Sequence, residues 1–64
     1  MESDRAQLSA LAGTIDDVTR RIVEIAGNYR GTPHDDIALG LDEVERALMT
    51  AQRHLAKVMR AMRE

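Results

Sequence analysis

The sequence contains no cysteine, tryptophan or phenylalanine, and Tyr29 is its only aromatic residue. Without cysteine, neither a disulfide framework nor a thiolate metal site can stabilise the fold. Any core must therefore be built from aliphatic side chains and methionine. A chain of 64 residues forms one domain at most. Below about 70 residues a core rarely supplies more than a few kcal/mol of net stability, so we expect a single domain, residues 1–64, that is stabilised by association.

Long apolar runs and a strong charge of one sign are also missing. No stretch approaches the roughly 20 apolar residues of a membrane-spanning helix, and the polar start of the chain is unlike a signal peptide. The net charge of −2 gives no bulk attraction to nucleic acid or anionic lipid. No phosphate-binding loop, nucleophile elbow, zinc spacing or EF-hand loop is found. These absences predict a cytoplasmic protein without enzymatic activity, cofactor, metal site or membrane contact.

Apolar residues recur at alternating steps of four and three along the second half of the chain. This spacing is the seam of a heptad repeat, which predicts a long helix with one narrow apolar stripe. The seam consists of Ile37, Leu41, Val44, Leu48, Ala51, Leu55, Val58 and Met62.

A second seam of the same kind runs along the first half and predicts a helix from about residue 4 to 29. Its members are Leu8, Leu11, Ile15, Val18, Ile22, Ile25 and Tyr29. Gly13 should cost this helix about 1 kcal/mol relative to alanine. Thr14 to Asp17 are similar to a capping box, so a break at Gly13 is the alternative. The heptad phase continues through Gly13, which favours one unbroken helix.

The segment between the two seams has the features of a short turn. Gly31 suits a left-handed helix C-terminus, Thr32 suits the N-cap of the next helix, and Pro33 suits its first position. Because short connections join antiparallel neighbours, the sequence predicts an all-α antiparallel helical hairpin, with helices over about 4–29 and 33–62.

Small residues flank both seams, where a two-stranded coiled coil usually carries Glu and Lys. They are Ala12, Thr19 and Ala26 on the first helix, and Gly40, Ala47, His54 and Ala61 on the second. Small flanks widen the face that another helix can cover. We therefore expect the hairpin to dimerise into a four-helix bundle, and its partner to be a second copy or another helical protein.

The second helix also carries a repeating basic face, formed by Arg46, Arg53 and Arg60. Such a face could contact phosphates or an acidic partner, which makes a small regulatory or nucleic-acid-associated protein the alternative function. No aromatic residues interleave with the arginines, so a solvated outer face is the simpler interpretation. His54 is interpreted as a residue at the edge of a helix interface rather than as a ligand.

Tyr29-Arg30-Gly31 forms an aromatic-x-Gly turn between two amphipathic helices. The chain in this respect resembles the small W-x-G helical hairpins of type VII secretion systems, with Tyr29 at the tryptophan position. The resemblance implies a small, all-helical, dimeric and non-enzymatic protein. It makes export by a type VII system the alternative to a cytoplasmic location, although the family's Tyr-x-x-x-Asp/Glu export motif has no match here.

A second resemblance concerns the first helix alone. Leu11, Ile15-Asp16, Ile22-Val23 and Arg30 are similar to the first helix of helical chorismate mutases, which implies such an enzyme as a remote alternative. Those enzymes use a third helix and several cationic residues, whereas the only lysine here is Lys57. The sequence therefore favours a non-enzymatic helical interaction module, an adaptor or assembly protein that acts as a homodimer.

Overall fold

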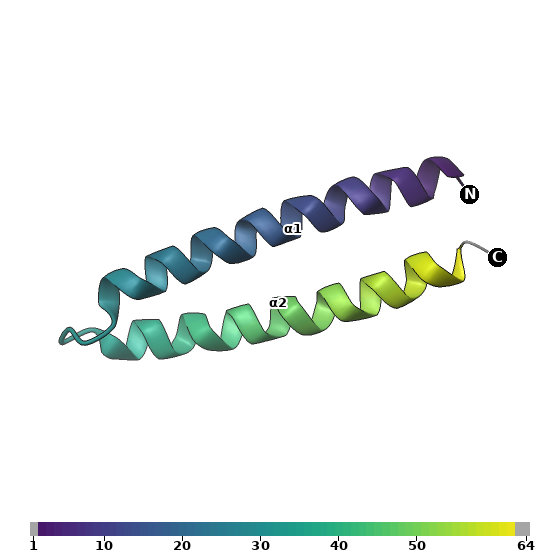
Figure 1. The fold of residues 1–64 in the computed structure, drawn as a ribbon. Coiled ribbons are helices and arrows are strands. Elements are labelled where there is room, and N and C mark those ends of the chain that lie inside the picture. Colours follow the sequence, from purple (N-terminus) through teal and green to yellow (C-terminus); the bar gives the residue numbers. More distant parts are fainter. Residues whose placement is uncertain (1, 63–64) are drawn as a thin grey trace.

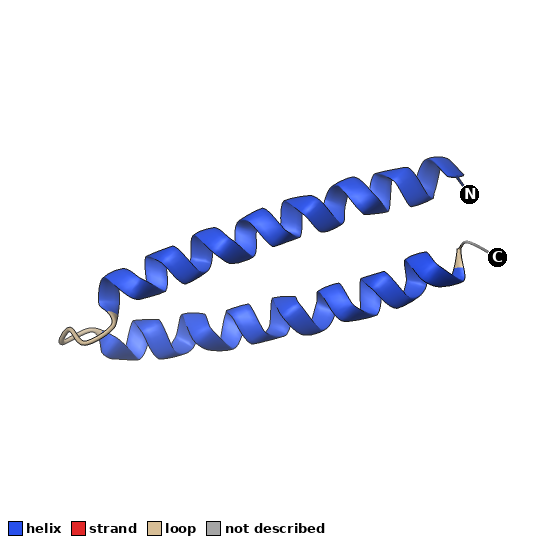
Figure 2. Ribbon diagram, viewed as in Figure 1, coloured by secondary structure: helices blue, strands red, loops and turns tan. Residues whose placement is uncertain are grey.

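The computed structural model describes residues 2–62 and shows two long helices packed as an antiparallel hairpin (Figure 1). Helix α1 spans Glu2–Tyr29 and helix α2 spans Asp35–Ala61. Figure 2 shows that the short turn between them is the single connection, so the helices run side by side along their length. The expected all-α hairpin is confirmed. α1 begins two residues earlier, and α2 two residues later, than the sequence predicted.

Helix α1 continues through Gly13 without interruption. The alternative of a break at this glycine is therefore wrong. The backbone of Gly13 is helical, and a Cβ added there would meet no atom within 4 Å. Glu2 and Asp4 lie in the first turn of α1, where carboxylates interact favourably with the helix macrodipole.

The turn is closed by hydrogen bonds from its own side chains. Gly31 has φ of +75°, a conformation that glycine adopts at little cost. Its N–H donates to Asp35 Oδ1 at 2.8 Å. The Thr32 hydroxyl accepts the N–H of His34 at 3.1 Å, and the Thr32 carbonyl accepts that of Asp35. Thr32 thus lies inside the turn and does not cap α2, which explains why α2 starts at Asp35 instead of Pro33.

The two helices face each other along a line of buried and half-buried residues spaced alternately by three and four. We call this set the contact line. On α1 it contains Arg5, Leu8, Ala12, Ile15, Thr19, Ile22, Ala26 and Tyr29. On the α2 side it contains Ala38, Leu41, Glu45, Leu48, Gln52, Leu55, Met59 and Met62. Contact is closest near the turn, where Ala26 and Ala38 are 1% and 0% exposed.

Two polar contacts fix the register of the helices. Gln52 Nε2 donates to the carbonyl oxygen of Ala12 at 2.9 Å. Near the turn, the Arg30 guanidinium donates two hydrogen bonds to the Asp42 carboxylate, at 2.9 and 3.0 Å. Such paired bonds between a guanidinium and a carboxylate have a defined geometry. They therefore fix the offset of the two helices along their axes.

The hairpin is a single layer of helices. Its Cα atoms extend over 50 × 15 × 9 Å, with a radius of gyration of 15.0 Å, whereas a compact domain of this length would have about 11 Å. Domains normally bury their apolar faces between two packed layers. Here the only layer is the pair α1 and α2.

Candidate interaction surface

One side of the hairpin exposes a regular set of large apolar side chains. We call this set the apolar side. Its members are Leu11, Val18 and Ile25 on α1, and Ile37, Val44, Ala51 and Val58 on α2. The six large side chains of the set are between 40% and 54% exposed. Along each helix they recur every seven residues, so they form two straight rows rather than scattered patches.

The two rows lie on the same side of the hairpin because of the helix geometry. Every member directly precedes a contact-line residue: Ile25 precedes Ala26, for example, and Ile37 precedes Ala38. One step back along a right-handed helix turns a side chain by about 100° in a fixed sense. Since the helices are antiparallel, the same step on both turns the side chains towards the same side of the pair.

The seam residues expected from sequence therefore divide into two sets within one chain. Leu8, Ile15, Ile22, Tyr29, Leu41, Leu48, Leu55 and Met62 lie on the contact line, and the other seven form the apolar side. Ala12, Thr19 and Ala26, which sequence placed beside the seam, lie between the helices instead. Each helix thus has apolar residues on two faces: one face packs against the other helix of the hairpin, and the second face is exposed.

Small residues of α2 extend the apolar side outward. Gly40, Ala47 and Ala61 are exposed, as is His54 in the same row. A Cβ added at Gly40 would meet nothing within 4 Å. The corresponding row on α1 is polar and bulkier, with Gln7, Thr14, Arg21 and Asn28. Another helix can consequently approach α2 more closely than α1.

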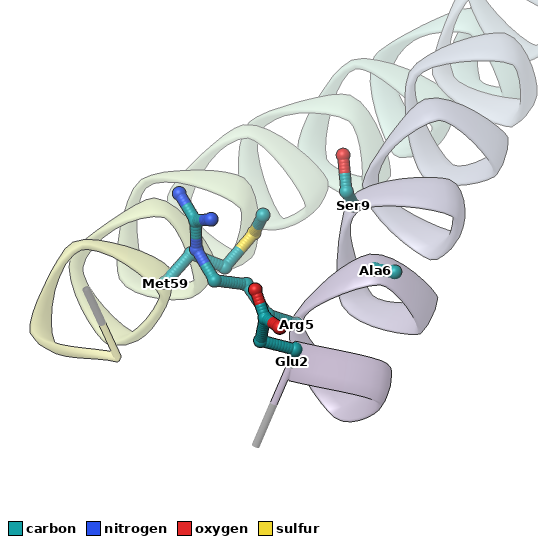
Figure 3. A pocket seen from close by; sticks show the side chains of 5 residues that line it. All are labelled: Glu2, Arg5, Ala6, Ser9 and Met59. Atoms are coloured by element: carbon teal, nitrogen blue, oxygen red, sulfur yellow. The ribbon is translucent and has the colours of Figure 1, made fainter.

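The opposite side of the hairpin is mixed in character. It carries the Arg30–Asp42 pair and a shallow groove lined by Glu2, Arg5, Ala6, Ser9 and Met59. Figure 3 shows the Arg5 side chain extending from α1 alongside Met59 of α2. The aliphatic part of an arginine can cover apolar surface in this way while its charged end stays in water. The charged groups that line the groove are one carboxylate, Glu2, and one guanidinium, Arg5.

The arginines of the predicted basic face directly follow contact-line residues of α2, so they lie on the side of the hairpin opposite the apolar side. A second shallow groove there is lined by Thr50, Arg53, His54, Ala56, Lys57 and Arg60. Arg53 Nη2 donates to the Thr50 hydroxyl at 3.3 Å, and Arg46 is exposed two turns earlier. The structure therefore gathers Arg53 and Arg60 with Lys57 and His54 on one basic surface, open to solvent.

Sequence reasoning missed the polar members of the contact line, which are Arg5, Thr19, Glu45 and Gln52. Thr19 is accommodated because its hydroxyl donates to the carbonyl of Ile15 at 2.8 Å, and Gln52 because of its bond to Ala12. Their signal in the sequence is a second series of three- and four-residue steps, which runs through Ala12, Thr19 and Ala26 on α1 and through Ala38, Glu45 and Gln52 on α2. The sequence predicts the α1 series as a flank of the seam because its residues are small or polar, and on α2 it predicts the flank on the other side of the seam, at Gly40 and Ala47.

Within residues 2–62, no three His, Asp or Glu side chains are grouped so that they could hold a metal ion. Neither described helix is long and apolar enough to cross a membrane. No protein-family model, curated protein or solved structure matches this chain.

Proposed function

We propose that this protein is a non-enzymatic association module that acts as a homodimer, an adaptor or assembly protein. Two hairpins pack through their apolar sides and form a four-helix bundle. The observation that carries this proposal is the exposure of half of each apolar seam on one side of a single-layer fold. A second hairpin supplies the layer that covers it.

The exposed area of the hairpin supports this proposal. A folded monomer of 7.1 kDa should expose about 4,100 Å², whereas the hairpin exposes 4960 Å². The excess is close to the area of about 800 Å² that each partner buries in a standard stable interface. One interface of ordinary size would thus bring the exposed surface to the value expected for the mass.

The pairing of apolar residues across the hairpin adds a second argument. Ala12 lies at the height of Gln52. By the same offset Leu11 lies near the height of Ala51, Val18 near that of Val44, and Ile25 near that of Ile37. Seven-residue spacing places successive levels about 10 Å apart. Three such levels form an apolar platform over both helices, which is the shape that another helical pair covers in a bundle.

Two valines of α1 provide a matched test of the apolar side. Val18 belongs to it and Val23 lies on the opposite side, yet their exposures are 42% and 41%. We expect Val18→Asp to dissociate the dimer, because a buried unpaired carboxylate is strongly unfavourable. Val23→Asp should leave the mass of the assembly unchanged. Light scattering after size exclusion, at matched concentrations, gives the mass of each.

The control makes the result specific to one side of the molecule. Both variants introduce the same charge into the same helix, so their intrinsic helix propensities are equal. Equal masses for the two variants, whether monomer or dimer, would refute the apolar side as the interface. A loss of helicity in Val18→Asp alone would be expected, since stability follows association.

The basic surface of α2 supports a second candidate, an association with nucleic acid or another polyanion. Its supporting observation is the gathering of Arg53, Lys57 and Arg60 along one groove. Retention on nucleic acid that falls steeply with salt would be its signature. Binding of that kind should be lost in Arg53→Glu and retained in Val23→Asp.

A further inference from the structure

The two ends of the hairpin carry opposite charge. Its turn half, residues 16–45, holds eight acidic and three basic side chains, a net charge of −5. Its free half, residues 2–15 and 46–62, holds two acidic and five basic side chains, a net charge of +3. The separation is complete on α2, where all acids precede Arg46 and all cations lie from Arg46 onward.

Two hairpins can cover each other's apolar sides in two symmetric ways. In the same-end arrangement both turns lie at one end, and α1 of each copy rests on α2 of the other. In the reversed arrangement the turns lie at opposite ends, α1 rests on α1, and α2 rests on α2. Each is a closed two-fold dimer with identical contacts on both copies.

The charge distribution discriminates between these arrangements. Same-end packing stacks two negative turn halves on each other, and likewise two positive free halves. Reversed packing stacks each negative half on a positive one. Complementary charge steers association and fixes orientation, whereas juxtaposed like charges are costly.

The small residues of α2 point to the same arrangement. Gly40, Ala47 and Ala61 flank the apolar side on α2 alone, whereas α1 has Gln7, Thr14 and Arg21 in this row. Close packing needs small residues on both helices of a contact. Only the reversed arrangement places α2 against α2 and so pairs these residues with each other.

We propose that the second copy lies reversed, with its acidic turn half over the basic free half of the first. This inference rests on the proposed function, since it specifies the partner and its orientation at the same apolar side. The attraction acts between the net charges of the two halves, −5 on the turn half and +3 on the free half.

A distance between the two turns tests the orientation directly. The chain has no cysteine, so Pro33→Cys gives one labelling site in the exposed turn. Pulsed electron paramagnetic resonance on the spin-labelled dimer should report a separation on the order of the 50 Å hairpin length. Same-end packing would bring the labels within about 20 Å, two helix spacings. A mid-helix label, Thr50→Cys, controls for label mobility.

Salt provides an independent readout with a defined sign. Attraction between opposite halves is screened by salt, so the Kd of the dimer should rise with sodium chloride. In same-end packing the screened interaction is a repulsion, and the Kd should fall. A short turn-to-turn distance, or tighter dimers at higher salt, overturns the reversed orientation but leaves the homodimer intact. A monomeric wild-type protein overturns the proposed function itself, and this inference with it.

Discussion

Neighbouring residues in this hairpin differ sharply in environment. Ile25 and Ile37 are 49% and 40% exposed, whereas the alanines that follow them are almost fully buried. Helices pack closely where their contact residues are small, and the larger neighbours then project to the side. The alanines consequently bring the helices together, while the branched residues define the surface that another protein can cover.

The Arg30–Asp42 pair is the residue-scale contact whose effect depends on pH. Hydrogen bonds from the Arg30 guanidinium, reinforced by its charge, hold the pKa of Asp42 below the ordinary value of 3.8 and outweigh the opposing effect of burial. A lowered pKa in the folded state means that the unfolded state binds more protons at low pH. The pair therefore stabilises the fold above the ordinary carboxyl pKa, and this stabilisation is lost as pH falls through the lowered value.

Asp42→Asn tests this pH dependence. The wild-type protein should melt at a higher temperature than the variant at neutral pH, and the difference should shrink as pH drops below 3.8. Arg30→Gln, which removes the guanidinium charge and its paired donors, should show the same pH-dependent loss relative to the wild-type protein. Melting curves at one protein concentration measure all three. A wild-type advantage that is undiminished at low pH would show that the pair is not its source.

At the scale of the helices, two glycines with different backbone conformations should respond oppositely to alanine. Gly13 is helical and its Cβ would meet nothing, so Gly13→Ala should stabilise the protein by up to about 1 kcal/mol. Gly31 has φ of +75°, and Gly31→Ala should destabilise it by about 1–2 kcal/mol. Chemical denaturation at equal protein concentration compares them. Two changes of the same sign would contradict these backbone assignments.

The helices and the turn could be predicted from sequence because their signals are local. Heptad spacing is continuous on both sides of Gly31, and no other segment favours a connection. The start of α2 was misplaced since the Thr32 hydroxyl binds within the turn, at His34, and not within the helix. The Thr32 hydroxyl can bond either within the turn or at the start of the helix, and these two hydrogen bonds are similar in strength. Residue types alone therefore do not predict which of the two forms.

The division of the apolar residues could not be predicted in the same way. Leu8, Ile15 and Ile22 belong to two overlapping heptad series, one through Leu11 and Val18 and the other through Ala12 and Thr19. Hydrophobicity favours the first series as the contact, whereas close approach of the helices favours the second. Tertiary packing decides between them: the second series lies between the helices, and the strongly apolar series remains exposed.

At the scale of the whole molecule, the hairpin is one layer with an apolar platform and oppositely charged ends. Ordering the backbone of a single layer costs about 1–2 kcal/mol per residue in conformational entropy. The apolar burial that offsets this cost is limited, because the fully buried members of the contact line are alanines. Covering the apolar side adds the burial that this balance needs. Folding and association should therefore be coupled.

Sedimentation equilibrium combined with circular dichroism over a dilution series of the wild-type protein tests this coupling most directly. We expect twice the mass of 7.1 kDa at high concentration, and a melting temperature that falls on dilution, because dissociation lowers the apparent stability by mass action. A stable monomer whose melting temperature is independent of concentration would contradict the account.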